Sequence, residues 1–358
     1  MKPILLPLLA LFFLACENKN STKESNASIQ KEQESKSLKM QTFSVIDEKK
    51  LPHRVIYTSS MDDIYTVFNS IGYAKKKWYK GFQIIPRVYL KRISSRWKDQ
   101  SSKISTQTKK DIFFKLITPA ILRANELIQI ERNHLIALAK NPASLNDEAK
   151  EWFLKIAKKY KVVKKDENLT INDTTIDKLL LRVDTIAPSL ALAQAAQESG
   201  WATSRFASEG NALFGQWTTS KTAMIPSKQR SQFSNFGLAR FKTPQDSVNS
   251  YMLNLNTHNA YNKLRQKRFN LRKEGKIATG LALCETLDKY SERGDEYVTD
   301  LKKMINYNHL AHFDKANLWD KEVITIAPIR SPKKIKKAVK IEDINQSDSN
   351  NSRKPEIK

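Results

Sequence analysis

The sequence predicts a mainly α fold from the spacing of its apolar residues, and two further observations exclude other classes. Apolar residues recur at intervals of three and four along several segments, which is typical of amphipathic helices. A hydrophobic content of 40% allows a substantial core, so a wholly disordered chain is excluded. The nine glycines form neither a GxGxxG nor a GxxxxGKS/T motif, which argues against a nucleotide-binding architecture.

The length and charge indicate more than one folded unit and a negatively charged partner. A chain of 358 residues suits about two domains with flexible ends, at roughly 100–200 residues per domain. The 62 Lys and Arg against 37 Asp and Glu give a formal charge of +25, which predicts contact with nucleic acid, anionic lipid or an anionic cell-wall polymer. Two cysteines exclude a disulfide scaffold and a four-cysteine zinc site.

Residues 1–16 are predicted to be a lipoprotein signal peptide. Lys2 precedes the uncharged apolar run Pro3–Ala15, which is too short to span a bilayer. The run ends at Ala15-Cys16, which resembles a bacterial lipobox and implies cleavage before Cys16 and its lipidation. An ordinary secretory peptide with an incidental cysteine is the alternative. In both cases we expect an exported cell-envelope protein with no nucleic-acid partner, and in the first case a membrane anchor at Cys16.

The N-terminal half is predicted to be helical and basic. Residues 17–40 are polar and predict a disordered tether, and residues 41–161 form the helical region. Pro119 predicts a kink or break in the longest helix. The expected helices run over Met61–Gly72, Lys109–Ala139 and Asp147–Tyr160.

The C-terminal half is predicted to begin after a polar linker, residues 162–173. A helix over Asp177–Ile186 precedes a second one over Pro188–Ser199, which Gly200 is well placed to cap. The small residues of this second helix imply close approach by its neighbours, hence a buried central helix. Residues 317–358 predict a basic, mostly disordered tail.

Glu198 is the strongest candidate for chemistry. It stands in the last turn of the apolar, Ala-rich helix, where the negative helix terminus and the apolar surroundings both disfavour a carboxylate. Both effects raise the pKa of Glu198 and favour a protonated side chain near neutrality, as a general acid requires. A glutamate in the last turn of a helix is otherwise usually a surface residue.

Several separated segments resemble the glucosaminidase domain of glycoside hydrolase family 73, and more closely the Bax-type bacterial proteins. The resemblance spans about residues 86–313 and implies that 174–316 form the glucosaminidase domain. It implies a mainly α (α+β), lysozyme-like helical domain with a small β-hairpin lobe. The segments that carry it are Leu190–Ala207, Glu209–Trp217, Ser250–Leu264 and Tyr290–Val298, with Pro86–Leu90 and Asn125–Ile128 upstream.

The resemblance also implies an activity and a set of site residues. The expected activity is an endo-type β-N-acetylglucosaminidase that cleaves the β-1,4 bond after N-acetylglucosamine in peptidoglycan glycan strands, without a cofactor or a metal. Glu198 aligns with the family's general acid. For the others, a core aromatic or a turn-stabilising asparagine is the alternative. The implied substrate-binding residues are Asn211, Phe214, Gln216, Trp217, Tyr251 and Tyr290.

One departure from the family concerns the second carboxylate that many glycosidases use. Between Trp217 and Pro244 the chain has no Asp or Glu, and Gly237 stands where Bax-type relatives show a glutamate. Three hypotheses follow. The substrate's acetamide attacks the anomeric carbon; a carboxylate from elsewhere serves, with Glu292 and Asp295 as candidates; or the protein mainly binds wall glycan.

We therefore interpret the sequence as an exported peptidoglycan hydrolase held against anionic envelope polymers by its basic surface. The alternatives are a catalytically weak, wall-binding lipoprotein scaffold and a lytic transglycosylase, which also works with a single glutamate.

Overall fold

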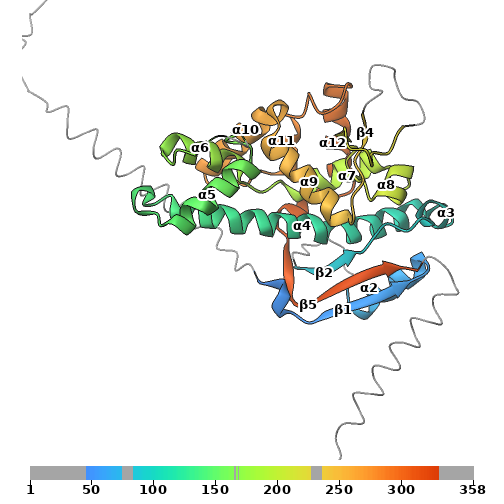
Figure 1. Cartoon of the computed structure of the whole chain (residues 1–358). Helices are drawn as coiled ribbons and strands as arrows, with labels where there is room; N and C mark the ends of the chain where they lie inside the picture. Colours follow the sequence, from blue (N-terminus) through green and yellow to red (C-terminus); the bar gives the residue numbers. More distant parts are fainter. Residues whose placement is uncertain (1–45, 75–83, 165–166, 168, 227–235, 330–358) are drawn as a thin grey trace, which may run out of the picture.

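The computed structural model describes residues 46–74, 84–164, 167, 169–226 and 236–329. One long helix, α4 (Thr106–Leu138), runs through the middle of the molecule, as Figure 1 shows. A three-stranded sheet lies on one side of α4, and most of the remaining helices lie on the other side. The fold is therefore mainly α with small sheets, as the sequence predicts.

The remaining elements are short. The helices are α2 (Met61–Ser70), α3 (Trp97–Ser101), α5 (Asp147–Lys159), α6 (Asp173–Arg182), α7 (Pro188–Ser199), α8 (Arg205–Gly210), α9 (Pro244–Thr257), α10 (Asn262–Lys273), α11 (Gly280–Cys284) and α12 (Asp295–Tyr307). The strands are β1 (His53–Thr58), β2 (Ile84–Leu90), β3 (Trp217–Thr218), β4 (Gly237–Leu238) and β5 (Asn317–Pro328). The 3-10 helices are η2 (Glu48–Lys50), η4 (Pro142–Ser144), η6 (Asn259–Tyr261) and η7 (Leu310–Lys315).

The predicted helices form close to their expected positions because local signals set their ends. The α7 helix spans Pro188–Ser199 as predicted, with proline in its first turn and Gly200 in the left-handed conformation after it. The α6 helix differs: the side chain of Asn172 caps it, so it begins at Asp173 and ends four residues before Ile186.

Pro119 lies inside α4 without ending it. A proline has no N–H to donate to the carbonyl four residues earlier, here that of Lys115. The hydroxyl of Tyr73 donates to this carbonyl oxygen at 3.3 Å, so the freed acceptor finds a partner from outside the helix. The predicted break is therefore wrong, because a distant residue satisfies the exposed backbone group.

The sheet corrects two predictions. Residues 317–358 were expected to form a tail, but Asn317–Pro328 form β5, the central strand of a parallel sheet ordered β1-β5-β2. The region 41–161, expected to be helical, contributes the two edge strands β1 and β2. Each strand's partner is far away in sequence (Val55 lies opposite Thr325), so no local pattern shows the pairing.

Truncating the central strand is expected to destabilise the whole chain. Ile324 of β5 is fully buried, so Ile324→Ala should lower the free energy of unfolding by about 2–5 kcal/mol. A urea titration followed by circular dichroism measures it. Val55→Ala on β1, where the side chain is 47% exposed, is the control and should change stability little. Equal losses in the two variants would contradict the central position of β5.

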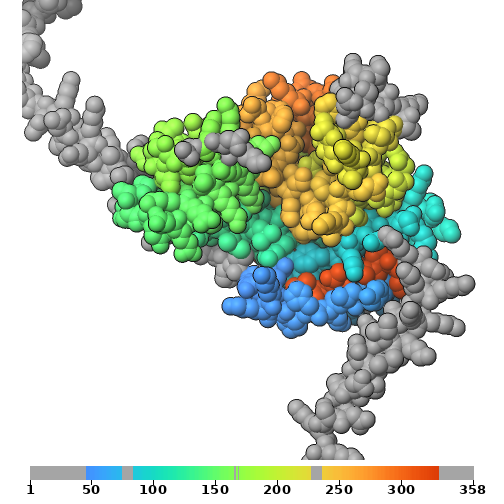
Figure 2. Space-filling view, viewed as in Figure 1, coloured from blue at the N-terminus to red at the C-terminus, as the bar shows by residue number. Residues whose placement is uncertain are grey.

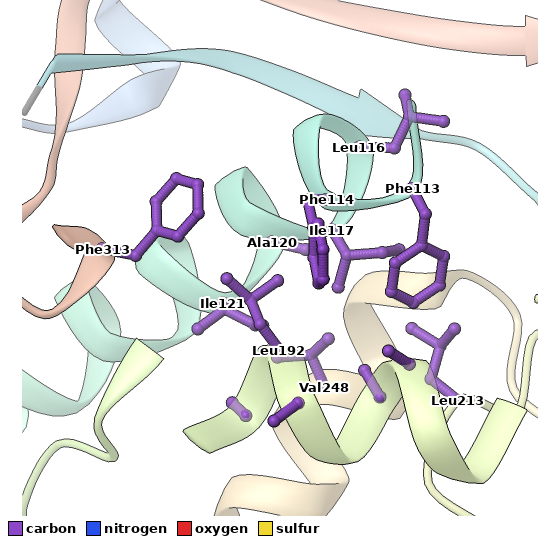
Figure 3. Close-up of a cluster of buried hydrophobic side chains, with 14 of the residues drawn as sticks. Phe113, Phe114, Leu116, Ile117, Ala120, Ile121, Leu192, Leu213, Val248 and Phe313 are labelled. Carbon is purple, nitrogen blue, oxygen red and sulfur yellow. The ribbon is translucent and has the colours of Figure 1, made fainter. Parts of the chain in front are cut away.

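The two halves of the chain share one hydrophobic core, so the predicted boundary at residues 162–173 does not separate independent domains. Figure 3 shows Phe114 and Ile117 of α4 on the side of Leu192 of α7, and all three are buried in the same cluster. A second cluster joins α5 to α6, and Val163 packs against it. In the space-filling view, the colours of the two halves meet without a gap (Figure 2).

Predictions for the signal peptide, the tether and the last residues of the tail lie outside the described residues. Within the described ranges, no helix is both long enough and apolar enough to cross a membrane.

Candidate active site

Glu198 lies in the last turn of α7, a helix whose residues from Pro188 to Ala196 are all buried. The small side chains predicted to allow close packing do so: α7 contacts α4, α11, α12 and η7. This packing fixes the helix axis, so the position of Glu198 is set by the core of the protein.

The chain after Glu198 is fixed by the N-terminal half. Trp201 follows Gly200 with a positive φ, and its backbone N–H donates to the carbonyl of Ala196 at 2.9 Å. The ring of Trp201 packs edge-on against Phe113 and Phe114 of α4, with centroids 5.5 and 5.3 Å away. Trp97 of α3 donates its indole N–H to the carbonyl of Trp201 at 2.9 Å. The end of α7 that carries Glu198 therefore depends on α3 and α4.

The carboxyl group of Glu198 is partly buried and has one strong hydrogen-bond donor. The hydroxyl of Tyr297, in the first turn of α12, donates to Oε1 at 2.9 Å. Burial raises the pKa of Glu198, and the Tyr297 hydrogen bond offsets part of that rise. The raised pKa is the direction predicted from the sequence, and it favours the protonated form that a general acid needs.

Tyr297 belongs to a group of aromatic and amide side chains around Glu198. Gln194, one turn before Glu198 on α7, donates to the hydroxyl of Tyr297 at 2.9 Å. The hydroxyl of Tyr251 on α9 donates in turn to Oε1 of Gln194 at 2.6 Å. Tyr290 stacks on Tyr297 with ring centroids 5.4 Å apart, and burial raises the pKa of both phenols, so they remain protonated donors.

Three predicted substrate-binding residues, Asn211, Phe214 and Tyr251, are buried. Phe214 stacks on Tyr251 with ring centroids 3.8 Å apart, and both are at most 2% exposed. Asn211 has a positive φ, accepts from the N–H of Ile93 and donates to the carbonyls of Phe241 and Lys242. Both amide hydrogens of Asn211 are thus used by the backbone. Substrate contact by these three side chains stays a prediction, and their burial matches the alternative of a core aromatic or a turn-stabilising asparagine.

The other three predicted residues lie at the small lobe or the edge of the tyrosine group. The lobe consists of β3 and β4, where Trp217 lies opposite Leu238. Trp217 is 55% exposed, and Gln216 donates to the hydroxyl of Ser250 at 3.1 Å. Tyr290 donates to the carbonyl of Phe214 at 3.3 Å and is partly exposed. Sugar contact by these three residues stays a prediction.

The candidates for a second carboxylate, Glu292 and Asp295, are both exposed. Among the described residues, no carboxylate contributes to the shifted pKa of Glu198. Gly237 lies buried in β4, in close contact with its neighbours. A Cβ at Gly237 would come within 2.8 Å of Ala223 and 3.0 Å of the carbonyl of Met224. The lobe is packed so that a glutamate at position 237 does not fit without rearrangement.

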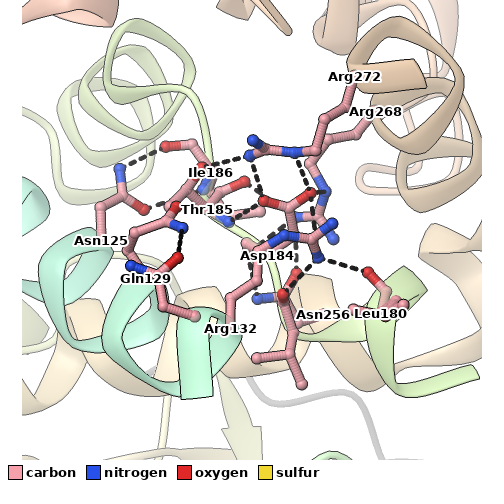
Figure 4. Close-up of polar contacts among 12 residues, drawn as sticks. Asn125, Gln129, Arg132, Leu180, Asp184, Thr185, Ile186, Asn256, Arg268 and Arg272 are labelled. Carbon is pink, nitrogen blue, oxygen red and sulfur yellow. Dashed lines mark hydrogen bonds and ion pairs between the residues drawn. The ribbon is translucent and has the colours of Figure 1, made fainter. Parts of the chain in front are cut away.

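The opposite end of α7 is held by a buried charge cluster. Asp184, 1% exposed, precedes α7 and faces Arg132 of α4 and both Arg268 and Arg272 of α10 (Figure 4). Burial alone would raise the pKa of Asp184, but the three guanidinium groups together outweigh it and hold the pKa well below its usual range. The pKa of Arg268 is lowered to about 10, mainly by burial. Asp184 thus joins the segment before α7 to α4 and α10.

A cavity of about 350 Å³ lies beside this cluster, lined by Arg272, Gln129 and Pro188 among others. Glu198 is ten residues further along α7, or about 15 Å at 1.5 Å per residue, so this cavity is not the site of its chemistry. In the described parts of the chain, no group of three or more His, Cys, Asp or Glu side chains could hold a metal ion.

A mainly helical domain with a two-stranded lobe and a partly buried glutamate at the end of its central helix defines a lysozyme-like domain. The model of the glucosaminidase family, described as mannosyl-glycoprotein endo-beta-N-acetylglucosaminidase, matches residues 175–310. "Protein bax" of Escherichia coli (strain K12) is 36% identical over 202 residues, which cover 56% of this chain and 70% of that protein. The protein therefore belongs to the Bax-type family and carries a glucosaminidase domain. No solved structure shows a significant match.

Two residues of the site, Gln194 and Tyr297, were not singled out from the sequence. Both lie within the segments that resemble the family, and Gln194 has a visible signal: it is a polar residue in an otherwise Ala- and Leu-rich run, four residues before Glu198. That spacing places both side chains on one face of the helix. Tyr297 is 99 residues from Glu198, so only the packing of α12 on α7 brings them together.

Proposed function

We propose that the protein is an exported peptidoglycan hydrolase that cleaves the β-1,4 bond after N-acetylglucosamine, with Glu198 as the general acid. The observation that carries this proposal is the partly buried Glu198, with a raised pKa, inside the segment matched by the glucosaminidase family. An exposed aromatic ring on the lobe, Trp217, suits stacking against the C–H face of a sugar.

In the first half of the proposed reaction, Glu198 gives its proton to the glycosidic oxygen as the bond from that oxygen to the anomeric carbon breaks. The bonding electron pair stays on the oxygen, so the leaving sugar gains a hydroxyl group. Stabilisation of the resulting carboxylate falls to Tyr297, whose hydroxyl already donates to Oε1.

The second half needs a nucleophile at the anomeric carbon. Because Glu292 and Asp295 are exposed and the packed lobe has no room for a side chain at Gly237, we assign this role to the substrate's acetamide oxygen. It bonds to the anomeric carbon and forms a cyclic oxazolinium ion. Water then opens this ring and restores the acetamide, while the carboxylate of Glu198 accepts the proton that the water loses. The sugar keeps its anomeric configuration.

The location of the protein is part of the proposal. Cleavage before Cys16 and lipidation there would anchor the chain in a cell-envelope membrane, and the charge of +25 would hold it against anionic envelope polymers. Such attraction is screened by salt, so binding to isolated cell walls should weaken as the salt concentration rises.

The rate should decline on the alkaline side, at a pH above the ordinary pKa of glutamate. Since burial raises the pKa of Glu198 in the folded chain, the protonated acid persists to higher pH than in a free glutamate, and kcat/KM falls as the pH passes this raised value. The same shift means that the folded state loses stability as the pH rises through the folded pKa. A pH profile of kcat/KM measures the first effect. If kcat/KM instead fell on the acidic side as Glu198 became protonated, Glu198 would act as a base.

Product analysis tests the proposed bond. Purified peptidoglycan is digested with the soluble form that starts after Cys16, and the sugar ends are identified by mass spectrometry before and after borohydride reduction. New reducing N-acetylglucosamine ends support the proposal. Anhydromuramyl ends would instead identify a lytic transglycosylase. A protein that sediments with the wall but releases nothing would be the wall-binding scaffold.

A further inference from the structure

Three side chains behind Glu198 form a single chain of hydrogen bonds. The order is Tyr251 to Gln194, Gln194 to Tyr297, and Tyr297 to Glu198, with distances of 2.6, 2.9 and 2.9 Å. The exposures of Gln194, Tyr251 and Tyr297 are 0%, 1% and 2%. A buried polar group without a partner destabilises the fold, so each of these donors and acceptors has to be matched.

Matching them gives the chain a direction. The hydroxyl hydrogen of Tyr251 is donated to Oε1 of Gln194, which orients the amide so that its Nε2 faces Tyr297. The oxygen of Tyr297 then accepts from that N–H, and its own hydrogen is donated to Oε1 of Glu198. Turning the amide around would leave the hydrogen of Tyr251 without this acceptor. The chain therefore delivers a hydrogen to one particular oxygen of Glu198.

The other oxygen of Glu198 faces Gly215, two residues before β3. Oε2 lies 3.7 Å from the place a Cβ would occupy on Gly215, which has a φ of +60° and no side chain to fill that space. Oε1 accepts the hydrogen of Tyr297, and a protonated carboxyl oxygen is a weaker acceptor than a carbonyl oxygen, so this hydrogen bond is stronger when the acidic proton sits on Oε2. The acidic proton of Glu198 is thereby favoured on Oε2, the oxygen beside Gly215.

We infer that Gln194 and Tyr251 are positioning residues, which hold the hydrogen of Tyr297 on Oε1 of Glu198 and so reserve Oε2 for the proton that is transferred. This inference rests on the proposed function of Glu198 and adds to it the oxygen that acts. Neither Gln194 nor Tyr251 touches the substrate in this account; both act through Tyr297.

Tyr251→Phe removes the first donor and keeps the ring that stacks on Phe214. The amide of Gln194 can then turn, so that its oxygen accepts from Tyr297 and Glu198 loses its donor. The carboxylate is less stabilised, so the pKa of Glu198 should rise and kcat should fall about tenfold with KM little changed. Gln194→Met, similar in volume, lets a proton on Oε1 donate to Tyr297 and should shift the pKa in the same direction.

The pKa of Glu198 is measured directly by carbon-13 NMR titration of labelled glutamate side chains, with Glu198→Gln used to assign the signal. Tyr73→Phe is the matched control, because it also removes a buried hydroxyl, but one that donates to the carbonyl of Lys115 on α4. It should leave the titration of Glu198 unchanged. The alkaline limb of kcat/KM should move with the NMR value in both positioning variants.

The titration does not require turnover, so it separates the two proposals. If the wild-type protein releases no product but both variants raise the pKa of Glu198, the proposed function fails and the hydrogen-bond chain stands. If both variants fold and melt at a lower temperature while the titration of Glu198 stays where it is in the wild type, Gln194 and Tyr251 only stabilise the core and the inference is overturned.

Discussion

Glu198→Gln is expected to lower kcat by about 10²–10⁴-fold, the contribution typical of a positioned general acid. Glutamine keeps the shape and can still accept from Tyr297, but it has no acidic proton to give to the glycosidic oxygen. KM should change little, because the amide fills the same space. The residual activity of the variant should show no alkaline limb in its pH profile, because the group that titrates there, the Glu198 carboxyl, is gone. Initial rates on soluble peptidoglycan fragments measure both.

The matched control for this prediction is Glu209→Gln. Glu209 lies on α8 close in sequence, is exposed, and pairs with Arg205 on the surface. It should retain wild-type kcat and an unchanged alkaline limb. A similar loss of rate in both variants, or a Glu198→Gln protein with more than about a tenth of wild-type kcat, would remove Glu198 from the chemistry.

Asp184→Ala is expected to be the most destabilising single substitution proposed here. It leaves Arg132, Arg268 and Arg272 facing one another without their shared carboxylate, and two of these arginines are at most 4% exposed. Breaking a buried ion pair by removing one partner costs about 3–5 kcal/mol. Urea denaturation should show a lower midpoint of that size. Asp177→Ala, at an exposed position of α6, should stay within about 0.5 kcal/mol of the wild type.

The stabilisation by Asp184 is expected to depend on pH. The folded pKa of Asp184 is lower than the unfolded value of about 3.9, so its contribution to stability is present above that value. It is lost as the pH falls toward the folded pKa. The gap in unfolding free energy between wild type and Asp184→Ala should therefore narrow as the pH drops below about 4. A gap that is constant with pH would mean that the charge of Asp184 is not what stabilises the cluster.

The helices could be predicted from the sequence because their signals are local. Pro188 and Gly200 mark the ends of α7, and its small residues give a buried helix in both the prediction and the structure. The sheet could not, because β5 pairs with strands more than two hundred residues earlier and carries three consecutive charged residues, Asp320 to Glu322, in its middle. Only the approach of β1 and β2 makes this segment the centre of a sheet.

The candidate site was predictable only where its signals are local in the sequence. Glu198 and its raised pKa follow from the helix that carries it. The partners that define its chemistry come from elsewhere: Tyr297 from α12, and Tyr251 from α9 through Gln194. The resemblance implies substrate binding by Phe214 and Tyr251, and the structure stacks them on each other in the core; composition does not distinguish a ring that faces a ligand from one that supports the site.

Isotope transfer from water shows which sugar receives the new hydroxyl group when Glu198 acts. Glycan strands of alternating N-acetylglucosamine and N-acetylmuramic acid are digested in water enriched in oxygen-18, and the new ends are analysed by mass spectrometry. If Glu198 drives hydrolysis after N-acetylglucosamine, the heavy oxygen appears at the reducing carbon of that sugar, and Glu198→Gln abolishes the labelled product. Label on N-acetylmuramic acid, or new ends without label, would contradict the account.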